Sequence, residues 1–137
     1  MDLLLNKLNY NGNDNIVIFN MPEEFSEFEK SIGKEVKIYK NNTAIKTEFI
    51  LVFLKTKSEL DNFISKNKDY LLSFEDDLIW FAYPKGTSKR YMGKTNLTRD
   101  KNWDSLSALG YKAVRMISID SDWTAFRVRK VKFIKKK

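Results

Sequence analysis

Three short runs of apolar residues stand out along the chain, and each run is apolar at both odd and even positions. They are Ile16–Phe19, Phe49–Leu54 and Leu78–Tyr83. Runs of this length are too short for a helix and are typical of strands that are buried on both faces. The pattern therefore predicts a central sheet that is covered by helices on both sides.

Each of these runs is followed by apolar residues at helical spacing, with a candidate capping residue in front of each predicted helix. Asn20, Ser58 and either Asp100 or Asn102 are the predicted N-caps, because short polar side chains satisfy the free amides of a first turn. Each helix then carries apolar residues three or four positions apart. The predicted stripes are Phe25, Phe28 and Ile32 in the first helix, Leu60, Phe63, Ile64 and Leu71 in the second, and Trp103 with Leu106 in the third.

Three further strands complete the predicted architecture. Val36–Tyr39 alternates as an edge strand does, and Ala113–Ile119 is joined by a turn at Asp120–Asp122 to a strand from Trp123 to about Phe133. We predict an α/β fold with a three-layer, Rossmann-like, mostly parallel sheet and a C-terminal antiparallel hairpin. The alternative is a ferredoxin-like α+β core with an added α-β-β unit, but its open sheet face requires alternating strands.

The composition restricts the kinds of site and reaction that the protein can support. The chain has 137 residues, enough for one domain over 1–137, and its basic end, 134–137, is predicted to fray. It contains neither cysteine nor histidine, which removes thiolate chemistry, zinc sites and the commonest general base. No apolar run is long enough to span a bilayer, and Met1–Leu5 lacks the basic start of a signal peptide. We therefore expect a soluble cytoplasmic protein without a metal.

Charge is unevenly distributed along the chain. Residues 1–83 contain 10 Lys and Arg against 14 Asp and Glu, whereas residues 84–137 contain 15 against 4. The net charge is +7. Such asymmetry favours an anionic partner for the second half, such as nucleic acid or another polyanion. The alternative is that these cationic side chains lie on the solvated surface and bind no partner.

The loop after Leu78–Tyr83 is the candidate site, because open α/β sheets bind ligands at the carboxyl ends of their strands. Glycines there free backbone amides beside hydroxyl and cationic groups, as an oxyanion cradle requires, although the spacing is not that of a P-loop. Trp123 and Tyr91 are candidate stacking residues, but a tryptophan at this position more often belongs to a core. The candidate anion-binding residues are Lys85, Ser88, Lys89, Arg90, Lys94, Arg99, Arg127 and Arg129.

Two groups of charged residues in this half of the chain also have a purely structural interpretation. Arg99 beside Asp100 also suits a simple ion pair at a helix start. Asp120 and Asp122 could hold Mg²⁺ together with a phosphate, but Asp-Ser-Asp is ordinary turn chemistry, and we predict a turn.

The order of elements from Phe49 onward, with a short helix and a terminal hairpin, resembles the second half of a class I methyltransferase fold. That resemblance implies an S-adenosylmethionine site, but the residues depart from it. The turn Asn20–Glu23 has no glycine, and Lys55–Lys57 lacks the acidic or Pro-Pro-aromatic motif of amino-methylating members. The sequence thus argues against S-adenosylmethionine as a cofactor and predicts none.

Several motifs in the second half also resemble a bacterial family of small proteins of unknown function. The resemblance implies a fold kept as a unit, with a basic loop and a Trp-Arg strand, and it transfers no activity. The motifs are Trp80–Lys85, Ser88-Lys89, Thr95–Asp100, Trp103-Asp104, Ser118–Asp120 and Trp123–Arg129.

Three hypotheses about function follow. The first is a non-enzymatic binding module for an anionic partner, namely nucleic acid, a nucleotide or an acidic protein. The second is a degenerate methyltransferase-like enzyme that uses the carboxyl ends of the strands. The third is a structural protein that forms a homodimer through its final strand.

Overall fold

A computed structural model describes residues 3–13 and 15–134, with twelve helices and strands in these ranges. The helices and 3₁₀ turns are α1 (Leu3–Lys7), η1 (Glu23–Phe25), α2 (Ser26–Ile32), α3 (Lys57–Leu72), α4 (Asp104–Ala108) and η2 (Val131–Phe133). The strands are β1 (Asn15–Phe19), β2 (Lys37–Lys40), β3 (Phe49–Phe53), β4 (Leu78–Pro84), β5 (Tyr111–Ser118) and β6 (Trp123–Lys130).

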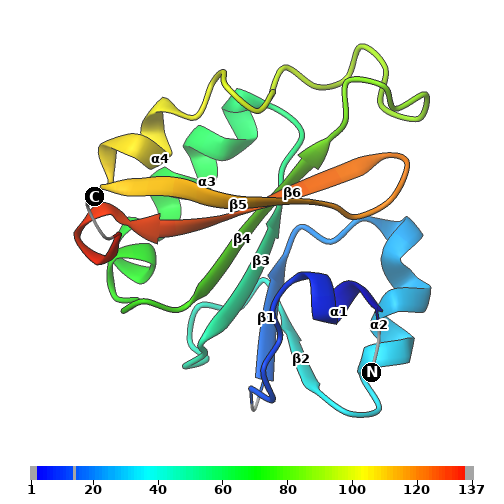
Figure 1. Ribbon diagram of the computed structural model, residues 1–137, viewed down its shortest axis with the longest axis vertical. Helices are drawn as coiled ribbons and strands as arrows, with labels where there is room; N and C mark the ends of the chain where they lie inside the picture. Colours follow the sequence, from blue (N-terminus) through cyan, green and yellow to red (C-terminus); the bar gives the residue numbers. More distant parts are fainter. Residues whose placement is uncertain (1–2, 14, 135–137) are drawn as a thin grey trace.

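The strands form one six-stranded sheet in the order β2-β1-β3-β4-β6-β5 (Figure 1). The strands β2, β1, β3 and β4 run parallel, whereas β6 runs antiparallel to both of its neighbours, β4 and β5. The predicted Rossmann-like sheet with a C-terminal hairpin is therefore confirmed, and the ferredoxin-like alternative is wrong. As predicted, β2 is an edge strand.

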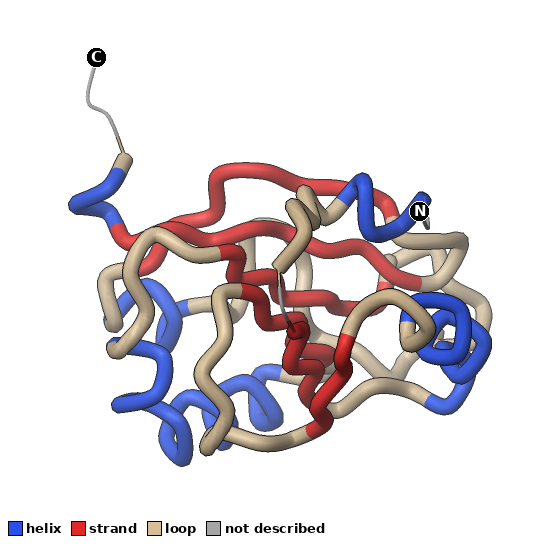
Figure 2. The backbone as a smooth tube through the Cα atoms, turned by 90° about the horizontal axis from the view of Figure 1, so that it is seen from below, coloured by secondary structure: helices blue, strands red, loops and turns tan. Residues whose placement is uncertain are grey.

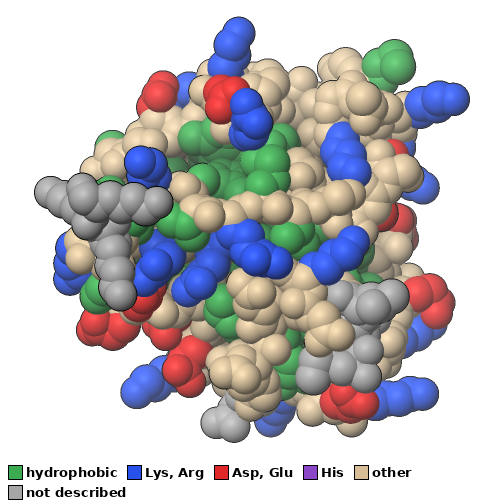
Figure 3. Space-filling view, viewed as in Figure 1, with side chains coloured by type: hydrophobic (Ala, Val, Ile, Leu, Met, Phe, Trp, Pro, Cys, Tyr) green, Lys and Arg blue, Asp and Glu red, His purple; other side chains and the backbone are tan. Residues whose placement is uncertain are grey.

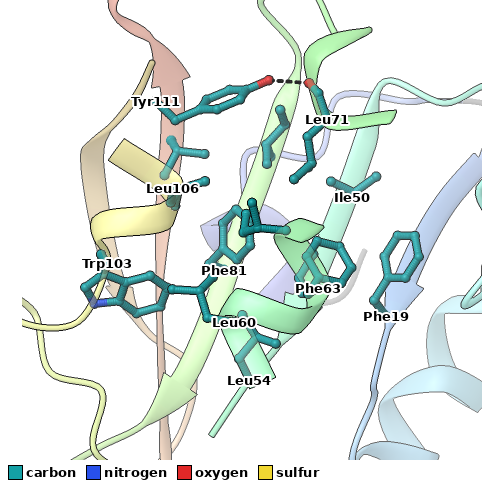
Figure 4. Packing of buried hydrophobic residues seen from close by; sticks show 14 of the residues in the cluster. Phe19, Ile50, Leu54, Leu60, Phe63, Leu71, Phe81, Trp103, Leu106 and Tyr111 are labelled. Carbon is teal, nitrogen blue, oxygen red and sulfur yellow. Dashed lines mark hydrogen bonds between the residues drawn. The ribbon is translucent and has the colours of Figure 1, made fainter. Parts of the chain in front are cut away.

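Helices cover both faces of the sheet (Figure 2). Phe81 and Tyr83 of β4 point to the face covered by α3 and α4, whereas Trp80 and Ala82 point to the face covered by α1 and α2. Figure 4 shows the core between the sheet and the helices α3 and α4, in which Tyr111 donates a hydrogen bond of 2.6 Å to the carbonyl of Leu71. The runs that are apolar at every position are thus buried on both sides.

The helix starts differ from the predicted ones. The helix α3, predicted to start at Ser58, is capped by Thr56 instead. The Thr56 hydroxyl accepts the Glu59 N–H at 3.2 Å and donates to the Glu59 carboxylate at 3.3 Å. Asn20 and Asn102 do not cap helices, because their φ angles of 59° and 75° lie in the left-handed region. Asparagine tolerates that region, so both residues reverse the chain instead.

The C-terminal hairpin is shorter than predicted. The strand β6 ends at Lys130, because the chain enters the 3₁₀ turn η2 there, so the extension to Phe133 is wrong. Residues 135–137 of the predicted frayed end lie outside the described residues. Within the described part of the chain, every helix is too short or too polar to cross a membrane.

The final strand β6 lies between β4 and β5, so the edges of the sheet are β2 and β5. A homodimer that pairs β6 with a second chain would require β6 to leave its neighbours. Homodimerisation remains a prediction, and β5 is the edge of the hairpin that a partner strand could reach.

Candidate anion-binding site

The loop that follows β4 is held against the turn between β5 and β6. The Ser88 side chain, in a residue that is 1% exposed, donates to the Asp122 carboxylate at 2.7 Å and accepts the Tyr91 N–H at 3.1 Å. The backbone N–H of Lys85 donates to the Asp122 carbonyl at 2.8 Å. The predicted anion-binding hydroxyl of Ser88 therefore shapes the loop and does not face a ligand.

Glu24, just after β1, ties the far end of this loop to the other side of the sheet. Its carboxylate accepts hydrogen bonds from the Tyr91 hydroxyl at 2.5 Å and the Trp123 indole at 3.1 Å, and Arg90 Nε lies 3.8 Å away. Burial alone would raise the pKa of Glu24, but these donors outweigh it and lower the pKa. Burial and the bond to Glu24 raise the pKa of Tyr91 to about 12.

The predicted stacking residues serve the same contact. Trp123 is 1% exposed and packs against Phe25, Phe53 and the ring of Tyr91, which lies 5.0 Å away, edge to face. A buried indole offers no face to a ligand, so the stacking role predicted for Trp123 is wrong and its core alternative is right. Tyr91 is half-buried and is held by Trp123 and Glu24.

The four predicted arginines all have carboxylate partners. Arg90 lies 3.5 Å from Asp122 as well as near Glu24. Arg99 pairs with its neighbour Asp100 at 3.3 Å, in agreement with the structural alternative. Asp76, just before β4, accepts two hydrogen bonds from Arg129, at 2.8 and 2.5 Å, and lies 3.9 Å from Arg127.

The bonds from Arg129 lower the pKa of Asp76 despite partial burial, and the nearby positive charge of Arg127 adds to this effect. Asp76 therefore stays ionised and serves both arginines. The charge of Asp77 also acts on Arg127, so two carboxylates compensate these two arginines.

The predicted lysines have no such carboxylate partners. Lys89 and Lys94 are exposed and form no ion pair with the described residues. Lys85 donates to the hydroxyl of Ser118 at 2.5 Å, a neutral partner that leaves its charge uncompensated. The cationic character of the loop thus rests on its lysines.

A second group of cations lies on the β5–β6 hairpin, where the two strands carry them in directly opposite positions. Arg115 is opposite Arg127, and Lys112 is opposite Arg129. Opposite residues of an antiparallel pair share one face, so these four side chains form a row, here called the basic strip. Figure 3 shows a row of Lys and Arg side chains that crosses the molecule along the hairpin.

A β-bulge creates the basic strip. The register shifts between Ala113 and Arg115, so Val114 is an extra residue in β5. Without it, Lys112 and Arg115 would point to opposite faces, because side chains alternate along a strand. Lys112 and Arg115 were not predicted as site residues, because the bulge hides their shared face in the sequence.

Lys7 extends the strip at the end of β5. Its ammonium group donates to the Ser118 carbonyl at 3.1 Å, and Lys85 reaches the hydroxyl of the same residue. Two cations from distant parts of the chain therefore meet at one residue beside the strip.

The acidic turn of the hairpin has a structural role. The Asp120 carboxylate accepts the N–H groups of Asp122 and Trp123, both at 2.8 Å. The predicted turn is confirmed. Across residues 3–13 and 15–134, no three side chains of the metal-binding types come together.

The structure contains two cavities of interest, at opposite ends of the sheet. A cavity of about 330 Å³ lies at the carboxyl end of β4, lined by Tyr83, Thr124 and residues 85–87 and 97–99. It adjoins the predicted loop.

The larger cavity, of about 700 Å³, lies at the amino ends of β1, β3 and β4. Glu48, Glu75 and Asp77 line it. Burial, reinforced by the neighbouring carboxylates, raises the pKa of Asp77. Because its rim is acidic, the larger cavity is unsuited to an anion, and the smaller one is the candidate site.

Solved structures with this fold include methyltransferases. A protein of the NADB-Rossmann superfamily from Streptococcus agalactiae aligns with 95% of this chain and 68% of its own, with a TM-score of 0.53 and 10% identity. The fold is Rossmann-like. A putative tRNA (m1A22) methyltransferase from Streptococcus pneumoniae aligns with 95% of this chain and 70% of its own, with a TM-score of 0.51 and 9% identity.

The N-methyltransferase NodS from Bradyrhizobium japonicum aligns with 93% of this chain and 92% of its own, with a TM-score of 0.50 and 10% identity. No protein-family model and no curated protein matches the chain. Identities this low show the fold alone. The predicted likeness to a methyltransferase fold is confirmed at that level, and the likeness to the small-protein family stays a prediction.

The residues in the place of a nucleoside cofactor do not fit one. The turn after β1 contains no glycine, and the N–H of Asn20 already donates to the Asn41 side chain at 2.9 Å. At the end of β2, where an acidic residue would bind ribose hydroxyls, stands Lys40, which pairs with Glu29 at 3.2 Å. The chain thus lacks the glycine turn and the acidic strand end by which this fold binds a nucleoside cofactor.

Proposed function

We propose that this Rossmann-like chain is a non-enzymatic module that binds single-stranded nucleic acid through the basic strip, Lys7 and Lys85. The observation that carries the proposal is the pairing of like charges across the hairpin, Arg115 with Arg127 and Lys112 with Arg129. Directly opposite like charges destabilise a sheet. Their cost is recovered when an anion lies over them.

The carboxylates of the protein do not remove this cost. Asp76 contacts Arg127 and Arg129, whereas Lys112 and Arg115 have no ion pair among the described residues. The Nε atom of Arg127 is buried without a hydrogen-bond partner, and burial lowers the pKa of this guanidinium. The uncompensated charges of Lys112 and Arg115 on this face favour an external phosphate as their partner.

The shape of the strip favours a polymer. From Lys112 to Ser118, β5 extends over roughly 20 Å at about 3.3 Å per residue. A free nucleotide would neutralise only one end of such a row, whereas successive phosphates of one strand match its length. Nucleic acid is therefore preferred to a single small anion.

The test is a titration with a labelled single-stranded oligonucleotide at several salt concentrations, followed by fluorescence anisotropy. Four uncompensated cations, Lys7, Lys85, Lys112 and Arg115, predict a slope of log affinity against log salt of about −3. The affinity should fall about 50-fold between 50 and 200 mM salt. A flat salt response, or equal binding of polyglutamate, contradicts the proposal.

A degenerate methyltransferase-like enzyme is the second candidate, supported by the shared fold. Its weakness is the turn after β1, where Asn20 and Asn41 bond to one another and no glycine allows close approach of a ligand. The nucleic-acid module needs no cofactor, so it accounts for the same residues without this conflict.

A further inference from the structure

The cavity at the carboxyl end of β4 is lined by Tyr83, whose hydroxyl has no hydrogen-bond partner among the described residues. Tyr83 is 4% exposed and lines the cavity, yet its hydroxyl makes no hydrogen bond with the described residues. By contrast, the hydroxyls of Tyr91 and Tyr111 bond to Glu24 and to the Leu71 carbonyl. The Tyr83 hydroxyl is not fully buried, so it stays free to donate a hydrogen bond to a ligand in the cavity.

The hydroxyl is held in place. The ring of Tyr83 packs edge to face against Trp103 at 5.4 Å and against Phe126 at 6.0 Å. Burial raises the pKa of Tyr83, although nearby Arg99 opposes this, so the group stays protonated near neutral pH and can donate. A rigid donor at the wall of a cavity selects ligands by the position of their acceptor.

The charges around the cavity select an anionic ligand. Lys85 lines it, and the only partner of its ammonium among the described residues is the neutral Ser118 hydroxyl. Arg99 also lines it, paired with Asp100 at an exposed position where the ion pair is weak. No carboxylate is among the residues that line the cavity.

The size of the cavity limits what enters. Its volume of about 330 Å³ is at the lower end of the range for ligand pockets and is enough for a planar ring system. Leu97 supplies an apolar wall. Lys85 lines the same cavity and would bind the charged part of such a ligand.

We infer that this cavity receives the base of a nucleotide, with the Tyr83 hydroxyl donating to the edge of the base and Lys85 binding its phosphate. The nucleotide could be free or part of a strand. The inference rests on the proposed function, because Lys85 belongs to both the cavity and the cationic surface.

The test compares the four ribonucleoside 5′-monophosphates with ribose 5-phosphate by calorimetric titration at low salt. Replacing Tyr83 by Phe removes only the hydroxyl, and Tyr39→Phe on the distant strand β2 is the matched control. At least one monophosphate should bind, ribose 5-phosphate should not, and Tyr83→Phe should weaken binding about fivefold or more. Tyr39→Phe should leave the affinity unchanged.

Two results would overturn the inference: no monophosphate binds at millimolar concentration, or Tyr83→Phe binds as tightly as the unmodified protein. The oligonucleotide titration separates this failure from that of the proposed function. Salt-dependent oligonucleotide binding that Tyr83→Phe does not alter removes the base pocket alone. Monophosphate binding without oligonucleotide binding removes the strip alone, and the cavity then serves free nucleotides.

Discussion

Reversing two charges of the basic strip, Lys112→Glu together with Arg115→Glu, should lower the affinity for a single-stranded oligonucleotide about 100-fold at low salt. Each cation that contacts a phosphate contributes about 1.5 kcal/mol or more, and the new carboxylates add repulsion. The slope of log affinity against log salt should also fall by about half, because two of four contacts are lost. Fluorescence anisotropy measures both quantities.

A matched control changes the net charge by the same amount elsewhere. Lys66 and Lys68 are exposed on α3, so Lys66→Glu with Lys68→Glu should reduce the affinity only slightly. If both double variants weaken binding equally, the protein's overall charge drives the interaction and the strip has no special role.

Replacing Trp80 by Ala should lower the free energy of unfolding by about 3–5 kcal/mol. Trp80 is fully buried in β4, and its indole N–H donates to the Leu8 carbonyl at 2.9 Å, which fastens the chain after α1 to the sheet. Truncation leaves a cavity and an unpaired carbonyl. A typical domain has only about 5–15 kcal/mol of stability, so the loss should be plain in urea unfolding.

Two comparisons give this result its meaning. Trp80→Phe keeps most of the packing but removes the hydrogen bond, so it should cost about 1–3 kcal/mol. Met92→Ala, at a residue that is 71% exposed, should change the stability by less than about 0.5 kcal/mol. A Trp80→Ala cost below about 1 kcal/mol would show that β4 is not the interior strand described above.

The fold could be predicted from the sequence because strands buried on both faces leave a strong apolar pattern along the chain. The runs that became β1, β3 and β4 are apolar at every position, a pattern that demands cover on both faces. The helix caps were harder. Thr56 and Ser58 are both good capping residues, and only the end of β3 decides that the helix starts after Thr56.

The site could be predicted only in part, because the sequence shows which residues are charged but not which charges meet in the fold. Arg129 and Asp76 are 53 residues apart in sequence, and no local pattern shows that they meet. Anion binding by the lysines of the loop stays a prediction. Lys112 and Arg115 were missed because the bulge at Val114 changes the face to which they point.

The most direct test of the account maps the bound oligonucleotide on the protein by amide chemical-shift changes in a ¹⁵N-labelled sample. We expect the largest changes in β5, in β6 and in residues 85–87 and 97–99, with little change after β1 and β2. Changes confined to the turn at Asn20–Glu24 and to Asn41, where this fold would bind a nucleoside cofactor, would contradict it.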